Sequence, residues 1–267
     1  MSHSRGEDLA LAHRLADAAD AITLTRYQAL DLTVTTKPDN TPVTDADKSA
    51  ESAIRALLHA HRPDDGIVGE EFGDEGLEKQ RYWVIDPIDG TKNFLRGVPT
   101  WATLIALVEK DSKGDQKVTV GVVSAPALFR RWYAHEGAGA FLVVNSQIPK
   151  KISVSQVSKM EDASISHSDF IGWGDRLGAF NSLLSSAWRT RAHGDFWSHM
   201  LVAEGAVDIA IEPELALWDM AALDIIVREA GGRFSNLDGV DGIHGGNGLS
   251  TNGLLHPTVV DAIRVKG

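Results

Sequence analysis

Cysteine is absent from the 267 residues, and no apolar run approaches the roughly 18 residues that a membrane helix needs. Without cysteine, disulfide bonds and thiolate metal sites are excluded, and a cytoplasmic location is expected. The first eight residues also lack the apolar stretch of a secretory signal. We therefore expect a chain with no membrane partner.

Positive charge is in short supply, because 26 lysines and arginines stand against 37 aspartates and glutamates, for a formal net charge of −11. Such a surface repels nucleic acid and anionic lipid, so neither is expected as a partner. A small anionic substrate is compatible with this charge only if cations lie in its site. Hydrophobic residues make up 43% of the chain, which allows a sizeable core in one large domain or two closely packed ones.

The first half of the chain combines helices with successive strands. Apolar residues at helical spacing predict a helix around 11–22 and a second one after Thr44, with Asp47 in capping-box position and a break from residue 59. Short apolar segments predict strands at 82–85, 102–108, 118–123, 130–135 and 138–144. This order indicates an α+β region with an antiparallel sheet.

In the second half of the chain, segments with the apolar pattern of a strand alternate with segments with the apolar pattern of a helix. Strands are predicted at 163–166, 188–191 and 207–211, and helices at 177–186, 196–205 and 220–230. Such alternation is typical of an α/β layer. We therefore predict an α+β fold with an α/β second half. An N-terminal α+β subdomain would span 1–148, and a C-terminal α/β subdomain would span 149–267.

The most informative motif is the run from Asp86 to Thr91. A buried strand delivers Asp86 at its end, and Asp89 follows three residues later, so both carboxylates can converge on one point. Gly90 permits close approach of the backbone, and a helix starting at Thr91 would place free N–H groups beside the acids. Carboxylates beside an anion site indicate Mg²⁺, which prefers oxygen ligands and bridges carboxylate to phosphate. The alternative is an ordinary β-turn with aspartates at its corners.

Three other acids support the metal hypothesis, although each has a simpler explanation. Glu70 follows a short apolar pair and could lie at a strand end. Asp219 stands just before the helix predicted at 220–230, where a carboxylate is a favourable N-cap. Asp47 could serve only its capping box.

Together these segments resemble the inositol-monophosphatase superfamily over about residues 10 to 260. The matching segments are Asp86 to Thr91, Trp218 to Ala222 continuing to Gly232, Val43-Thr44 with Asp47 and Glu51, and Gly69 to Glu71. The resemblance implies a layered αβαβα sandwich, a homodimer, and a phosphatase that uses two to three Mg²⁺ ions on a small phosphorylated substrate.

The resemblance also implies roles for individual residues. One magnesium ion would be held by Glu70, Asp86 and the carbonyl of Ile88. A second ion would be held by Asp86, Asp89 and Asp219. Glu70 would also contact a third ion through a water molecule. The catalytic residues would be Asp47 and Thr91, which would orient and deprotonate the attacking water, together with Glu70. The N–H groups of Gly90 and Thr91 would bind phosphate.

Substrate choice is expected in the second half, where the resemblance places Arg191, Gly194, Asp195, Glu212 and Asp219 against the leaving group. Asp195 departs from the small residues usual in inositol enzymes, and a carboxylate there suits a cationic substrate. The segment from Gly194 to Trp197 resembles the actinobacterial histidinol-phosphate phosphatase branch. We therefore predict hydrolysis of L-histidinol phosphate to L-histidinol and phosphate. Inositol 1-phosphate or a broad range of sugar monophosphates is the alternative, and a non-catalytic regulator is a third.

The ten histidines, which lack an HExxH pattern, are interpreted as surface or loop residues.

Overall fold

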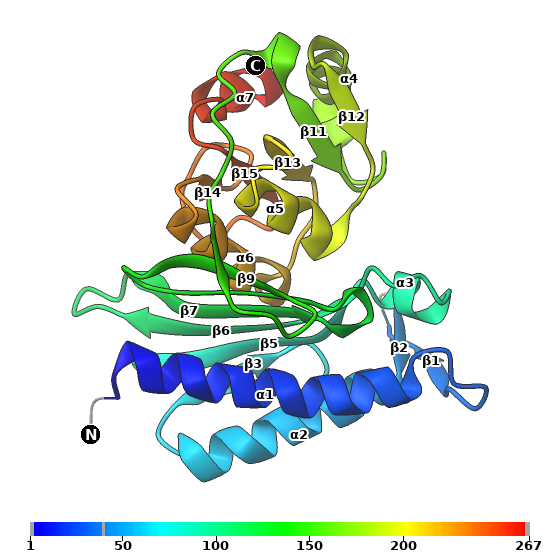
Figure 1. Ribbon diagram of the computed structural model, residues 1–267, viewed down its shortest axis with the longest axis vertical. Coiled ribbons are helices and arrows are strands. Elements are labelled where there is room, and N and C mark those ends of the chain that lie inside the picture. Colours follow the sequence, from blue (N-terminus) through cyan, green and yellow to red (C-terminus); the bar gives the residue numbers. More distant parts are fainter. Residues whose placement is uncertain (1–2, 39–40, 265–267) are drawn as a thin grey trace.

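The computed structural model describes residues 3–38 and 41–264 as five layers, helices alternating with two sheets (Figure 1). The helices are α1 (Arg5–Arg26), α2 (Asp45–His61), α3 (Thr91–Leu95), α4 (Leu177–Ser186), α5 (Asp195–Ala203), α6 (Leu217–Glu229) and α7 (His256–Ile263). Short 3-10 turns span Pro126–Leu128, Met160–Asp162 and Gly174–Arg176. The predicted αβαβα sandwich is confirmed.

The first sheet has eight strands in the order β10-β9-β8-β7-β6-β5-β3-β4. Its strands are β3 (Gly66–Gly69), β4 (Gly73–Glu75), β5 (Arg81–Asp89), β6 (Ala102–Lys110), β7 (Gln116–Ala125), β8 (Arg130–His135), β9 (Gly139–Val144) and β10 (Lys150–Ile152). The predicted antiparallel pairing holds except between β3 and β5, which run parallel. A separate hairpin joins β1 (Val34–Thr36) to β2 (Pro42–Thr44).

The second sheet has five strands in the order β12-β11-β13-β15-β14. Its strands are β11 (Ser164–His167), β12 (Arg189–Arg191), β13 (Ile209–Glu212), β14 (Arg233–Ser235) and β15 (Gly248–Thr251). The predicted strand–helix alternation is found through α6, whereas β14, β15 and α7 were not predicted. Both β12 and β13 lie parallel to β11, and β15 runs antiparallel to β13.

Strand β5 explains why the first sheet lies inside the molecule. Trp83 and Ile85 belong to the cluster formed with α1 and α2, whereas Tyr82 and Val84 belong to the cluster formed with α5 and α6. Successive side chains of a strand point to opposite faces, so a sheet covered on both sides requires a continuous apolar run. The strand therefore carries its final aspartates into the interior, beneath the layer of α5 and α6.

The structure corrects three details of the sequence interpretation. Helix α2 continues to His61, and α6 begins at Leu217, so Asp219 lies inside the first turn rather than before it. His167, His199 and His256 are buried rather than on the surface. Strand β10 continues the first sheet past residue 148, and the division there stays a prediction. Within 3–38 and 41–264, no helix is both long and apolar enough to cross a bilayer.

Candidate functional site: a buried carboxylate cluster

The end of β5 is bent out of regular pairing. Its register against β6 shifts between Asp86 and Asp89, around Pro87, which has no N–H to donate to the ladder. The backbone N–H of Ile88 turns back and donates to Asp86 Oδ1 at 2.9 Å. Thr103 Oγ1 donates to the carbonyl of Pro87 at 2.8 Å and fixes the bend. The two aspartates consequently lie at the two ends of this irregular last part of β5.

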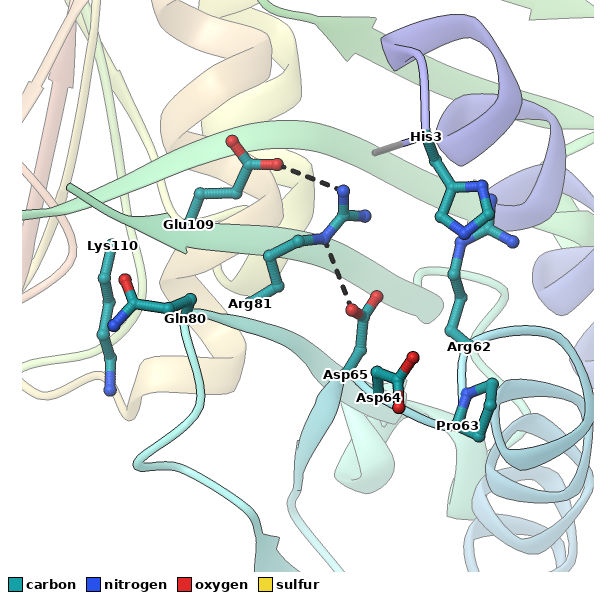
Figure 2. Close-up of a pocket in the computed structure, with 9 residues that line it drawn as sticks. All are labelled: His3, Arg62, Pro63, Asp64, Asp65, Gln80, Arg81, Glu109 and Lys110. Atoms are coloured by element: carbon teal, nitrogen blue, oxygen red, sulfur yellow. Dashed lines mark ion pairs between the residues drawn. The ribbon is translucent and has the colours of Figure 1, made fainter. Parts of the chain in front are cut away.

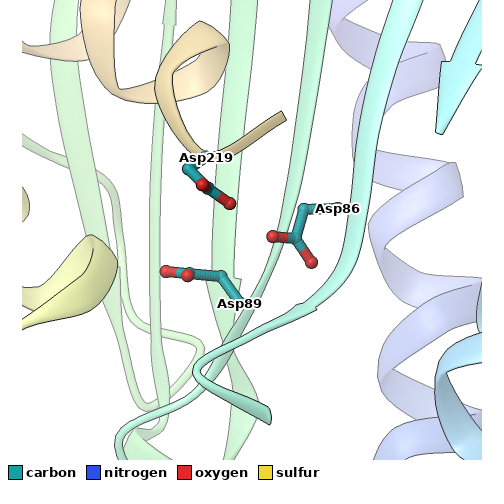
Figure 3. A group of neighbouring side chains, drawn as sticks. All are labelled: Asp86, Asp89 and Asp219. Carbon is teal, nitrogen blue, oxygen red and sulfur yellow. The ribbon is translucent and has the colours of Figure 1, made fainter. Parts of the chain in front are cut away.

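Asp219 joins these two aspartates from the opposite layer. One carboxylate oxygen from each of Asp86, Asp89 and Asp219 lies within 4.8 Å of the others (Figure 3). Asp219 is held in the first turn of α6, where the N–H of Ala216 donates to its Oδ2 at 2.6 Å. The cluster therefore needs both the β5 motif and a helix 130 residues further along the chain.

The cluster is electrostatically costly without a cation. Burial, followed by repulsion from Glu70, raises the pKa of Asp86 well above its ordinary value, and burial with Asp195 and Asp219 does the same for Asp89. Burial raises the pKa of Asp219 to about 7. Three converging carboxylates that provide only oxygen ligands fit a hard divalent cation such as Mg²⁺.

Glu70 lies directly after β3, at the edge of the same region. Its Oε1 accepts from Lys37 Nζ at 2.7 Å, and the same nitrogen lies 2.7 Å from Glu71 Oε1. The buried Glu51 supports this turn because its Oε2 accepts from the N–H of Glu71 at 2.8 Å. Lys37, on the β1–β2 hairpin, thus provides a counter-charge for Glu70 that sequence analysis did not anticipate.

Asp47 and Thr91 show how α2 and α3 face the cluster. The predicted capping box is present, with Asp47 Oδ2 accepting from the N–H and the hydroxyl of Thr44. Asp47 Oδ1 is buried and makes no hydrogen bond within the described residues. Burial raises the pKa of Asp47 to about 6. Thr91 Oγ1 donates to the carbonyl of Ile88 at 3.0 Å, which places its hydroxyl at the cluster.

Gly90 occupies a position that requires glycine. Its backbone is left-handed, with φ +81° and ψ 38°, and it forms the N-cap of α3. A Cβ there would lie 2.9 Å from the carbonyl oxygen of Thr100 and 3.3 Å from Asp195 Oδ2. The backbone of this turn therefore lies close both to the segment before β6 and to the start of α5.

A pocket of about 300 Å³ opens beside the cluster on the side of the second sheet. Its charged lining residues are six acids and one lysine: Asp89, Asp169, Asp195, Glu212, Glu214, Asp219 and Lys92. Glu212, at the end of β13, is buried, and its Oε1 makes no hydrogen bond within residues 3–38 and 41–264. Burial raises the pKa of Glu212 to about 8. The acids of this pocket outnumber its lysine, and a cation bound there would favour their charged forms.

The predicted substrate residues are not all brought to this pocket. Asp195, Glu212 and Asp219 line it, and Gly194 is the N-cap of α5 beside it. Arg191 is exposed and does not line it, and its Nη1 donates to the carbonyl of Thr190 at 2.7 Å. Sequence analysis missed Asp169, which lies in a loop without a motif, and assigned no role to Glu214. It also missed Asn93, although that residue lies two positions after Thr91.

A second hollow, of about 420 Å³, lies at the opposite end of β5 (Figure 2). It is lined by His3, Arg62, Pro63, Asp64, Asp65, Gln80, Arg81, Glu109 and Lys110. Arg81 lies 3.4 Å from Asp65 and 3.5 Å from Glu109, and it also pairs with the buried Asp8. Arg62 also pairs with Asp8, so the two arginines of this hollow already have carboxylate partners.

Comparison with known proteins agrees with this geometry. A sequence model described as the inositol monophosphatase family matches residues 5–264. The histidinol-phosphatase of Mycobacterium tuberculosis is 56% identical over 97% of this chain and 98% of its own length. The histidinol-phosphatase of Streptomyces coelicolor is 58% identical over 94% of each.

A solved structure shows the same architecture. The inositol monophosphatase from Zymomonas mobilis superposes with a TM-score of 0.84 at 30% identity, covering 98% of this chain and 99% of its own. The family match and these two relatives therefore cover nearly the whole chain, and the solved structure has the same fold. The chain belongs to the inositol monophosphatase family.

Proposed function

We propose that this chain is a magnesium-dependent phosphatase that hydrolyses L-histidinol phosphate to L-histidinol and phosphate. The observation that carries the proposal is the acidic pocket beside the metal-type cluster, which is lined by Asp169, Asp195, Glu212 and Glu214 as well as by Asp89 and Asp219. Histidinol carries an amine and an imidazole, so a carboxylate-lined pocket suits it better than a neutral polyol. The identity of 56% to a histidinol-phosphatase over nearly the whole chain supports the same substrate.

The proposed metal ligands are Glu70, Asp86, the carbonyl of Ile88, Asp89 and Asp219, for two to three ions. When bound, magnesium would neutralise the phosphate dianion, lower the pKa of a water molecule and stabilise the leaving alkoxide. No covalent intermediate with a side chain is needed, because phosphoryl transfer depends mainly on positioning and electrostatic stabilisation.

The remaining roles belong to groups around the cluster. Asp47, whose Oδ1 is buried without a partner among the described residues, is proposed to take a proton from the attacking water through Thr91. The N–H groups of Gly90 and Thr91 are proposed to bind phosphate oxygens at the start of α3. Asp195 and Glu212 would then bind the cationic leaving group.

The test compares kcat/KM on histidinol phosphate and on a neutral ester, β-glycerophosphate. Asp195→Asn and Glu212→Gln should each lower the ratio of the two values by roughly tenfold to 150-fold, the worth of a charge-assisted hydrogen bond. Both esters share the phosphate and the metals, so the ratio isolates the leaving group. A wild-type enzyme that prefers inositol 1-phosphate, with unchanged ratios in both variants, would overturn the histidinol assignment.

The resemblance to the family also supports a homodimer as the proposed assembly. Light scattering at micromolar concentration should then give twice the mass of one chain. A single-chain mass that persists as concentration rises would contradict it.

A further inference from the structure

The side chain of Asp195, at the start of α5, is held by a hydrogen bond from α3. Asn93, on α3, donates from Nδ2 to Asp195 Oδ2 at 3.0 Å. The same nitrogen donates to the carbonyl of Thr100, also at 3.0 Å. Because an amide nitrogen carries two hydrogens, both bonds can form together, and they fix the orientation of the Asn93 side chain.

The backbone at the start of α5 is strained so that Asp195 can reach α3. Asp195 has φ +51°, a left-handed value that costs conformational free energy for any residue with a Cβ. Gly194 before it has φ +70° and ψ 174°, a region that is essentially restricted to glycine. Backbone conformations of this kind persist only when surrounding contacts hold them, and the hydrogen bond to Asn93 is such a contact.

A second hydrogen bond ties the same turn to the metal-type cluster. The N–H of Phe196 donates to Asp89 Oδ2 at 2.7 Å. The Phe196 side chain is buried and packs against Trp132, so the helix start cannot slide without opening the core. The bond to Phe196 therefore fixes the backbone of α5, and the bond to Asn93 fixes the carboxylate that projects from it.

The chemical nature of Asn93 matters as much as its position. A neutral amide can hold a carboxylate without cancelling its negative charge, whereas a lysine or arginine there would form an ion pair. One oxygen of Asp195 accepts from Asn93, and the carboxylate lines the pocket together with Lys92, whose positive charge is available to it without an ion pair at residue 93. A charged group bound in a fixed rotamer loses less entropy when its partner arrives.

We propose that Asn93 is a positioning residue that acts through Asp195 to set the preference for a cationic leaving group. The inference rests on the proposed function, because it takes Asp195 as the group that binds the substrate cation. It adds a specificity residue on α3, outside the second-half segment where substrate choice was expected.

The experiment is a double-mutant cycle of Asn93→Ala and Asp195→Asn, read as the kcat/KM ratio of histidinol phosphate to β-glycerophosphate. Asn93→Ala should lower this ratio by about fivefold or more, because Asp195 loses the donor that orients its carboxylate. In the Asp195→Asn background, Asn93→Ala should change the ratio by less than about twofold, because residues that act through one another are not additive.

Two further variants keep the result interpretable. Asn181→Ala, an exposed change on α4, is the matched control and should leave the ratio unchanged. Asn93→Ser retains a shorter donor and replaces Asn93→Ala if that variant melts well below the wild type. Equal losses on both esters would show that Asn93 only supports the phosphate-binding turn, and would overturn the inference.

The failure of the inference differs from the failure of the proposed function. If wild type prefers histidinol phosphate and Asp195→Asn lowers the ratio while Asn93 variants do not, the inference alone is wrong. If wild type shows no preference for histidinol phosphate, the proposed function is wrong, and the inference falls with it.

Discussion

At the scale of single residues, Asp89 takes part in two contacts at once. Its carboxylate belongs to the cluster with Asp86 and Asp219, and its Oδ2 also accepts the backbone N–H of Phe196. A buried acid in this position costs free energy because of desolvation and like-charge repulsion. A bound cation would remove that cost, so the charge of Asp89 serves binding more than folding.

Asp89→Asn should consequently reduce kcat by roughly 100-fold or more, comparable to the loss of other preorganised electrostatic groups. The amide keeps an oxygen that can accept from Phe196, so the fold should survive. Steady-state kinetics at saturating magnesium, with a melting curve for each protein, tests both statements.

The control for this change is Asp74→Asn, which removes the same charge from the exposed strand β4. It should leave kcat within about twofold of wild type, since exposed charges are strongly screened. If Asp89→Asn retained activity within about threefold of wild type, Asp89 would not be a metal ligand.

At the scale of elements, α1 and α2 both begin with a capping box. Ser4 and Glu7 form a capping box at α1, and Thr44 and Asp47 form one at α2. Only the second box faces the carboxylate cluster, because α2 enters from the β1–β2 hairpin beside Glu70. A comparison of the two capping boxes therefore separates the structural role of a cap from the catalytic role proposed for Asp47.

Thr44→Ala and Ser4→Ala should each lower the free energy of unfolding by about 1 kcal/mol, the usual worth of an N-cap. Thr44→Ala should also lower kcat by about tenfold or more, because Asp47 loses the hydroxyl that orients it. Urea denaturation and kinetics on the same preparations test this prediction. Equal activity in the two variants would show that Asp47 acts only as a cap.

At the scale of the whole molecule, the cluster links metal binding, pH and stability. In the absence of cations, the raised pKa of Asp219, about 7, means that the folded protein holds a proton that the unfolded chain releases near pH 4. Its contribution to stability is thus lost as pH rises through about 7. Buried histidines such as His199, whose pKa burial lowers to about 3, act in the opposite direction.

The melting temperature in millimolar magnesium minus that in EDTA measures the contribution of the carboxylate cluster, because the contributions of the distant histidines are the same in both buffers and cancel. It should be small at pH 5.5 and increase toward pH 8, since carboxylates must be deprotonated to bind metal. At a hundredfold excess over the dissociation constant, magnesium should add about 2.7 kcal/mol to the free energy of unfolding. A melting temperature that does not respond to magnesium at any pH would contradict a shared carboxylate site.

Local patterns along the chain determined much of this protein. The bounds of α4 and the capping box at Thr44 follow from near-neighbour spacing, which the sequence displays directly. The motif from Asp86 to Thr91 also contains its own turn, because Pro87 and Gly90 act on adjacent residues. Asp86 and Asp89 could therefore be named from this motif, whereas the role of Asp219 was implied only by the family resemblance.

Only the tertiary structure decided which of these groups meet. Asp219 reaches Asp86 through the packing of α6 on the first sheet, and Asp195 reaches Asn93 through a strained turn at α5. Lys37, Asp169 and Glu214 come from loops with no periodicity, and their contacts depend on residues far away in the chain. Such contacts arise from the burial of whole layers, whose free energy is shared among many side chains and is not encoded in any short motif.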